Sequence, residues 1–189
     1  MKAVIFNGAR EDDPIIDASE SSLFHLLMEG GWEVELIELR EKRIAGCLGC
    51  FGCWVKTPGT CVIGDYGRES TKKAFQSDLL VWLTPVTFGG YSSELKKALD
   101  RLIPLLLPYF EIYKGQTHHQ MRYDKYPKIV VIGTEPHKEE YEETFFALTE
   151  RNMLNLRPPK HAAGISKNKS PSEVSSFVSD LLRKVEVLP

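Results

Sequence analysis

Three short, mainly apolar runs limit most strongly what this chain can fold into. They cover residues 2–6, 79–84 and 129–132. A strand that is apolar on both sides must be covered on both faces, which is the environment of a central strand in a parallel sheet. Two more strands are predicted, one at 34–39, where apolar and acidic residues alternate as near a sheet edge, and a weaker one at 161–165.

Stretches with helical spacing of apolar residues separate these strands. Asp13 followed by Pro14 is typical of a helix N-terminus, and Ser170 with Glu173 forms a capping box. The five predicted helices run from Pro14 to the Gly30-Gly31 pair, over 68–76, over 94–103 before Pro104, over 139–154, and from Ser170 onward. Residues 108–126 show no clean period and are expected to form an excursion.

Five β/α units in 189 residues predict a single domain spanning 1–189. The expected fold is α/β and flavodoxin-like, with three layers and a doubly wound, five-stranded parallel sheet in the order 2-1-3-4-5. In such sheets the ligand lies at the carboxyl ends of the strands, where strands one and three diverge. The loops at 7–14, 85–93 and 133–138 are therefore the expected ligand contacts.

The chain's charge and hydropathy limit the classes of partner that it is expected to bind. The formal net charge is −2 and no basic stripe is present, which argues against nucleic acid as a main partner. The longest apolar run, 102–110, is interrupted by Pro104 and Pro108 and is too short to cross a membrane. The N-terminus turns polar too early for a signal peptide. We therefore expect a cytoplasmic protein with neither a membrane nor a nucleic-acid partner.

All four cysteines lie in one glycine-rich stretch with the spacing C-x2-C-x2-C-x7-C: Cys47, Cys50, Cys53 and Cys61. Clustered cysteines in a reducing compartment point to a metal or to redox chemistry rather than to disulfides. Three evenly spaced thiolates can supply three corners of a [4Fe–4S] cluster. A four-cysteine zinc site more often has two separated C-x2-C pairs. The third alternative is a set of packed, reduced thiols.

The stretch after the third strand has residue types that suit contact with a flat ligand. Pro85, Gly89 and Gly90 allow the backbone to approach a planar ring closely, and Phe88 and Tyr91 offer aromatic surfaces. Serines at 92 and 93 are suited to cap the next helix, whose positive end favours negative charge on a ligand. The alternative is an ordinary turn between a strand and a helix.

The stretches at 47–65 and 84–101 resemble the flavodoxin-like NAD(P)H-dependent FMN reductases, and within them the iron–sulfur flavoproteins. The resemblance covers roughly residues 1–135. It implies a [4Fe–4S] cluster on the four cysteines, with the last spacing variable. It also implies cofactor contacts at Gly8, Ala9, Arg10, Thr84, Pro85, Val86, Thr87, Phe88, Gly89, Gly90, Tyr91 and Ser92.

The loop expected to hold the FMN phosphate departs from the family's pattern. Relatives have Gly-Ser-x-Arg, whereas Gly8 is followed here by Ala9 and Arg10 and then by three acidic residues at 11–13. A helix N-terminus binds phosphate through free N–H groups, but Asp13 would occupy that place if it caps the helix. Either the acids point away and a serine (Ser19, Ser21 or Ser22) replaces the missing one, or FMN binds weakly or not at all.

The function that this resemblance implies is an FMN-dependent oxidoreductase. NAD(P)H would reduce the flavin, and a small-molecule acceptor such as a quinone, a free flavin or an electron carrier would reoxidise it. A homo-oligomer is expected, with 108–126 as a contact region. Two alternatives are an electron-carrying iron–sulfur flavoprotein and a binding protein that has lost FMN.

No side chain is assigned a catalytic role from the sequence. His118 and His119 are adjacent and should point to opposite sides of an extended chain, so a solvated loop is favoured over a metal pair. His137 follows the fourth strand, where it would either touch a ligand or be an ordinary loop residue. Asp100 and Arg101 are expected to serve structure by forming ion pairs.

Overall fold

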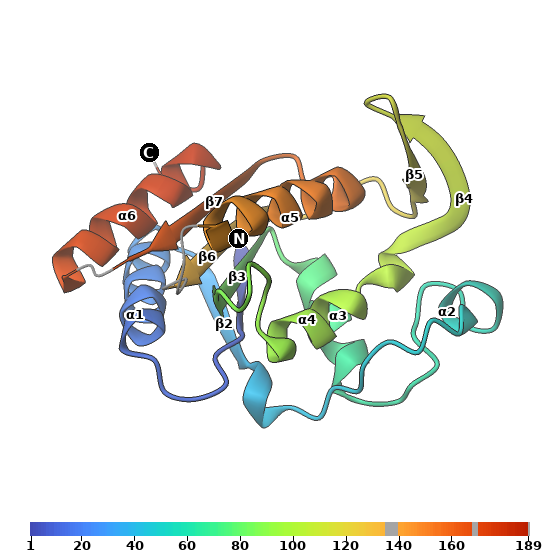
Figure 1. Ribbon diagram of the computed structural model, residues 1–189, viewed down its shortest axis with the longest axis horizontal. Helices are drawn as coiled ribbons and strands as arrows, with labels where there is room; N and C mark the ends of the chain where they lie inside the picture. Colours follow the sequence, from blue (N-terminus) through green and yellow to red (C-terminus); the bar gives the residue numbers. More distant parts are fainter. Residues whose placement is uncertain (135–139, 168–169, 189) are drawn as a thin grey trace.

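The computed structural model describes residues 1–134, 140–167 and 170–188 (Figure 1). Within these ranges five parallel strands form one sheet in the order β2-β1-β3-β6-β7, which confirms the predicted 2-1-3-4-5 order of the flavodoxin-like fold. The strands are β1 (Lys2–Asn7), β2 (Glu33–Glu38), β3 (Leu79–Pro85), β6 (Lys128–Thr134) and β7 (His161–Ser166). The alternating strand at 34–39 is thus the edge strand β2, as predicted.

Helices cover both faces of the sheet. The described helices are α1 (Pro14–Glu29), α2 (Gly52–Val55), α3 (Tyr66–Gln76), α4 (Ser93–Asp100), α5 (Glu140–Leu156) and α6 (Pro171–Lys184), with short 3-10 turns at Leu39–Glu41 and Ile103–Leu105. Figure 1 shows α1 and α6 together on one side of the sheet. None of these helices is long and apolar enough to cross a membrane.

The side-chain alternation of the strands explains the two layers. In β1, Val4 and Phe6 are buried in a cluster with α3, α4 and α5, whereas Ala3 and Ile5 are buried in a second cluster with α1 and α6. Each central strand therefore contributes apolar side chains to two cores, which is why its sequence is apolar throughout. Burying a large apolar side chain contributes about 1.5–3 kcal/mol.

The predicted excursion is an antiparallel hairpin formed by β4 (Leu106–Tyr113) and β5 (Gln116–Met121). Lys114 and Gly115 at its turn both have positive φ, at 49° and 74°, which suits a tight two-residue turn. The hairpin projects from the body of the molecule beside α2 (Figure 1). The sequence did not predict these two strands, because they alternate poorly and carry Pro108.

Two of the helical segments differ from the sequence prediction. The helix expected over 94–103 ends at Asp100, and Pro104 lies in the following 3-10 turn instead. Within the cysteine stretch, which was expected to be loop, residues 52–55 form the single turn α2. The predicted capping box of α6 is present, with the Glu173 carboxylate accepting from the Ser170 N–H. These differences leave the positions of the loops at the carboxyl edge unchanged.

Candidate functional site

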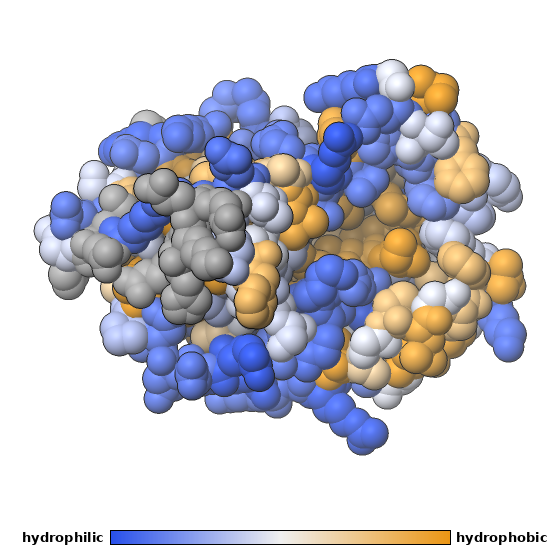
Figure 2. All heavy atoms as spheres, viewed as in Figure 1, coloured by the Kyte–Doolittle hydropathy of each residue, from blue (hydrophilic) through white to orange (hydrophobic). Residues whose placement is uncertain are grey.

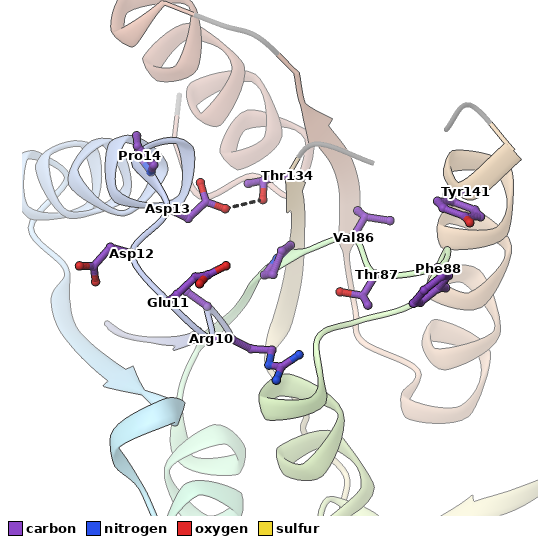
Figure 3. A pocket seen from close by; sticks show the side chains of 12 residues that line it. Arg10, Glu11, Asp12, Asp13, Pro14, Val86, Thr87, Phe88, Thr134 and Tyr141 are labelled. Carbon is purple, nitrogen blue, oxygen red and sulfur yellow. Dashed lines mark hydrogen bonds between the residues drawn. The ribbon is translucent and has the colours of Figure 1, made fainter. Parts of the chain in front are cut away.

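A cavity of about 570 Å³ opens at the carboxyl edge of the sheet, where β1 and β3 diverge (Figure 3). Its size lies within the range of small-molecule sites. One wall is the loop 9–14 after β1, and the other is 85–88 after β3. Thr134, the last residue of β6, and Tyr141 of α5 complete the lining. The topological switch point thus holds a cavity, as expected from the fold.

Six of the twelve residues predicted to contact a cofactor line this cavity: Ala9, Arg10, Pro85, Val86, Thr87 and Phe88. The other six support its walls. The hydroxyl of Ser92 donates to the Gly8 carbonyl and caps α4 by accepting from Leu95 N. Thr84 Oγ1 accepts from Ser92 N at 3.0 Å. The two walls are therefore joined behind the cavity by Ser92.

Tyr91 and the glycines also lie behind the surface of the cavity. The Tyr91 ring is buried edge-on against Trp82 and Phe145, and its hydroxyl accepts from Asn152 at 2.9 Å. A Cβ at Gly8 would lie 2.8 Å from the Leu95 Cβ, so only glycine allows this close approach. The Tyr91 ring faces the core and does not line this cavity. Its predicted contact with a flavin ring therefore stays a prediction.

The chain after β3 makes a tight turn at residues 87–90, which projects Phe88 toward the cavity. Thr87 and Gly90 exchange backbone hydrogen bonds of 2.9 Å, and Phe88 and Gly89 between them have φ of 50° and 77°. Positive φ is strained for a bulky residue and marks a candidate functional position. Phe88 is 81% exposed and meets Tyr141 edge-on, with ring centroids 6.0 Å apart. These two rings form an aromatic rim.

The loop after β1 is held by its own side chains. Asn7 Oδ1 accepts from Ala9 N, while its Nδ2 donates to Glu20 and Glu38. Burial, and then the nearby Glu20 carboxylate, raise the pKa of Glu38. The Gly8 N–H donates to Leu83 O at 2.8 Å. The amides of Gly8 and Ala9 are thus already used by the fold.

Asp13 caps α1. Its Oδ1 accepts from Ile15 N at 2.9 Å and from Ile16 N at 3.2 Å, and its Oδ2 accepts from the Thr134 hydroxyl at 3.2 Å. Figure 3 shows Asp13 turned toward Thr134, Glu11 pointing toward the opposite wall, and Asp12 pointing away. Asp12 pairs there with Arg40 at 2.9 Å. The prediction that α1 begins at Asp13 and Pro14, with Asp13 as its cap, is therefore confirmed.

The cysteine stretch lies elsewhere, against the hairpin, and contributes no residue to this cavity. Trp54 of α2 donates to the Leu106 carbonyl and its ring packs against that of His119. Cys47 and Cys50 are exposed, Cys61 is half-buried and Cys53 is buried. Burial, and then the neighbouring Cys61 thiol, raise the pKa of Cys53. Among the described residues, no three His, Cys, Asp or Glu side chains are gathered as a metal site.

A buried ion pair fastens both ends of the cysteine stretch. Arg101, which is 1% exposed, binds the Asp65 carboxylate with both terminal nitrogens at 2.7 and 3.0 Å. The same guanidinium donates to the carbonyls of Ala45 and Ile63, and Asp65 also accepts from Ala45 N. Asp100 pairs with Lys96 instead. Arg101 thus serves structure, as expected, and its partner is Asp65, which the sequence did not reveal.

A second cavity of about 380 Å³ lies between the hairpin, α4 and α5, and is lined mainly by apolar side chains. His119 lines it, whereas His118 lies on the other side of β5 and contacts Asn155 at 2.9 Å. The two histidines therefore do not form a pair. They lie in a strand, not in the solvated loop that we expected. His137 lies outside the described residues.

The sequence matches the family described as NADPH-dependent FMN reductase over residues 1–138, which is most of the chain. The chain belongs to this family. An iron-sulfur flavoprotein of Methanocaldococcus jannaschii is 32% identical over 105 residues, which are 56% of this chain and 53% of the relative. The chain thus spans about half the length of that curated relative. The resemblance inferred from residues 47–65 and 84–101 is confirmed by these two matches.

Solved structures share the fold. An NAD(P)H:quinone oxidoreductase from Methanothermobacter marburgensis matches with a TM-score of 0.65 over 97% of this chain and 95% of that chain, at 17% identity. An azoreductase from Bacillus anthracis matches with a TM-score of 0.66 over 98% and 96%, at 10% identity. At these identities the likeness shows a common flavodoxin-like architecture.

The cavity fits the two ends of FMN unequally. The ring end has an aromatic rim and a close-lying turn, where the amides of Phe88 and Gly89 have no acceptor among the described residues. Of the described residues, the phosphate end has one cation, Arg10, beside Glu11 and Asp13. Asp13 already accepts from the helix amides that a phosphate would use. The residues present therefore fit the ring and do not fit the phosphate in the family's usual manner.

Tyr141 is the cavity residue that sequence reasoning missed. Thr134 belongs to the loop 133–138, which was expected to contact a ligand, although it was not singled out as a cofactor contact. Tyr141 lies in the helix expected over 139–154, and its distance in sequence from the other lining residues gave no indication of the cavity. No catalytic acid or base was predicted.

Proposed function

We propose that this chain is an NAD(P)H-dependent flavin oxidoreductase that passes electrons to a small-molecule acceptor such as a quinone, a free flavin or an electron carrier. FMN is the flavin in the name of its family. The observation that carries the proposal is the cavity at the switch point with its rim of Phe88 and Tyr141. Family membership supports the chemistry, and the cavity supports the place.

A flavin bound here would supply the hydride acceptor, and the chain's own residues would orient it. Phe88 and Tyr141 offer ring surfaces at the mouth of the cavity. Pro85 and the turn at 87–90 form a rigid wall, because Val86 N donates to Thr134 O and the turn closes on itself. The amides of Phe88 and Gly89 would donate to a ring carbonyl. A nicotinamide and then the acceptor would use the open side of the cavity in turn.

The test is a flavin titration of the purified protein, followed by an assay of NADPH and NADH oxidation with a quinone. Flavin fluorescence should be quenched on binding. Phe88→Asn should weaken flavin binding about three- to tenfold, which is the usual contribution of an aromatic contact. Asparagine tolerates positive φ, so the turn should persist.

Phe51→Asn is the matched control. Phe51 is also exposed and also has positive φ, at 54°, but it lies in the cysteine stretch and not at the cavity. Its replacement should leave flavin affinity unchanged. Absence of flavin binding at several hundred micromolar would overturn the proposed function, and equal effects of the two variants would place the flavin elsewhere.

An electron-carrying iron–sulfur flavoprotein is the second candidate. It is favoured by the curated relative of that name and by four thiols close enough for the other three to raise the pKa of Cys53, after the larger effect of burial. The described arrangement does not form a ligand set, so no reaction step is derived from a cluster. Anaerobically purified protein should show a broad absorbance near 400 nm that Cys50→Ser abolishes. Colourless protein would refute this candidate and favour the alternative in which the four cysteines are packed, reduced thiols.

We also propose that the chain forms a homo-oligomer in the reducing cytoplasm, where clustered thiols persist. The support is an apolar patch, here called the hairpin patch, around the hollow in Figure 2. Its exposed members are Leu48, Phe51, Val55, Tyr109, Phe110 and Ile112. A contiguous exposed apolar surface commonly marks an interface. Sedimentation analysis should find a dimer or larger species, which Phe110→Ser with Ile112→Ser dissociates; a monomeric wild type would refute this.

A further inference from the structure

The first turn of α1 has no donor left for a phosphate. Pro14 occupies the first helical position and carries no N–H. The next two amides, of Ile15 and Ile16, both donate to the Asp13 carboxylate. The N–H of Asp17 donates to the Asp13 carbonyl at 2.9 Å and begins the helical ladder. A dianion arriving at this helix end would meet a carboxylate that already holds its donors.

Two serines of α1 that were considered as replacements for the missing serine of the family direct their hydroxyl groups to the helix itself. Ser19 is fully buried and donates to the Ile15 carbonyl, and Ser22 donates to the Ala18 carbonyl, both at 2.8 Å. Neither residue lines the cavity, and nor does Ser21. The alternative in which a serine of α1 replaces the missing one is therefore not realised.

The charge of the loop also opposes a phosphate. Asp12 is neutralised by Arg40, which leaves Glu11 and Asp13 against Arg10, the one cation on the cavity's wall among the described residues. Among the described residues, the partners of the Asp13 carboxylate are neutral groups: two amides and the Thr134 hydroxyl. Like charges a few ångströms apart at a partly buried site repel by an amount on the order of a few kcal/mol. The uncompensated charge sits at the N-terminus of α1, the place where a helix would bind a phosphate.

From this arrangement we infer that Asp13 is a specificity-determining residue that acts against the 5′-phosphate of the flavin. The cavity binds riboflavin at least as tightly as FMN, through the ring end alone. The inference rests on the proposed function, because it requires a flavin to bind between the two walls. It assigns the site a substrate class, the flavins without a phosphate, which its family's name does not suggest.

The experiment measures the ratio of two dissociation constants, Kd for FMN divided by Kd for riboflavin, by fluorescence quenching on the full chain. The expected ratio for the wild type is one or more. Asp13→Ser and Asp13→Asn both keep a side chain that can cap the helix, so the loop should persist. Each should lower the ratio about tenfold, a change of about 1.4 kcal/mol, by tightening FMN binding while riboflavin binding stays the same.

Asp17→Asn is the matched control. Asp17 is an exposed carboxylate in the same first turn of α1, and it does not line the cavity. Its removal changes the net charge equally and should leave the ratio unchanged. A similar fall in the ratio for Asp17→Asn would mean that only the overall charge matters, and would overturn the assignment to Asp13.

The two proposals fail in different ways. If neither flavin binds, the proposed function itself is wrong. If FMN binds more tightly than riboflavin in the wild type, or if both Asp13 variants leave the ratio unchanged, the flavin site stands and the role of Asp13 is wrong. A thermal melt of each variant shows whether it is folded, so that loss of binding by unfolding is recognised.

Discussion

Two aspartates cap helices beside the cavity and beside the cysteine stretch, and their surroundings differ in one respect. Asp13 caps α1 beside the cavity, and Asp65 caps α3 at the end of the cysteine stretch. Asp65 is paired with the buried Arg101, whereas the described partners of Asp13 are all neutral. A carboxylate whose charge is balanced by a cation, like that of Asp65, contributes to stability alone. A carboxylate without a cation, like that of Asp13, also determines which charged groups can bind next to it.

The largest effect is expected from Arg101→Ala. This change leaves the Asp65 carboxylate buried without its partner and frees both ends of the cysteine stretch. Breaking a buried pair by removing one member costs about 3–5 kcal/mol, and the free energy of unfolding in urea should fall by that amount. Lys96→Ala, which removes the exposed pair with Asp100 on the same helix, should cost about 0.5 kcal/mol or less. If the two variants lost equal free energy of unfolding, the buried pair of Arg101 would stabilise the fold no more than the exposed pair of Lys96.

A smaller effect, which depends on pH, is expected from Asp65→Asn. Burial works to raise the pKa of Asp65, but the hydrogen bonds from Arg101 and from backbone amides outweigh it, so the pKa is lowered. A lowered pKa means that the unfolded state takes up the proton first. The stabilisation is therefore present above the ordinary carboxyl pKa and is lost as the pH falls through the folded value.

At pH 7 the wild type should exceed Asp65→Asn by about 2–4 kcal/mol, since the variant leaves a buried arginine unpaired. The gap should begin to narrow below about pH 4, where the carboxyl of the unfolded state takes up a proton, and it should narrow until the pH has fallen through the lowered pKa of the folded Asp65. Urea unfolding at a series of pH values measures it. A gap that stays constant down to pH 2 would show that the charge of Asp65 does not matter.

The smallest effect is expected at Asp13. Asp13→Ala should lower the free energy of unfolding by about 1 kcal/mol, the usual cost of losing an N-cap. Asp13→Asn should differ from the wild type by only a few tenths, because asparagine caps as well and no cation among the described residues depends on the charge. Thermal melts at neutral pH compare the two. If Asp13→Asn is as damaging as Asp13→Ala, the contrast with Asp65 disappears.

The sheet could be predicted because its central strands carry their environment in their own residues. The apolar runs at 2–6, 79–84 and 129–132 require cover on both faces, and this requirement gives the strand order within a known fold. The hairpin could not be predicted in the same way. Its strands Leu106–Tyr113 and Gln116–Met121 lie largely outside the core, so no burial pattern was imposed on them.

The cavity could be predicted only in part, because the sequence determines its loops but not the orientation of their side chains. The loops after β1 and β3 follow directly from the fold, but which side chains line the cavity depends on rotamers and on distant elements. Tyr91 turns into the core because its hydroxyl finds Asn152 and Thr149 there, while Phe88 is projected outward by its turn. The pairing of Arg101 with Asp65 joins residues far apart in sequence, which a single sequence does not reveal.

The fastening of the cysteine stretch at Ala45 and Asp65 has a consequence for how this branch of the family can diverge. The closure is made by groups at the two ends, so it does not depend on what lies between them. Lengthening a closed loop adds only about 0.6 kcal/mol of entropy for each doubling. Residues 46–62 can therefore gain, lose or respace thiols, while the Ile63 carbonyl, the sheet and the cavity stay as they are.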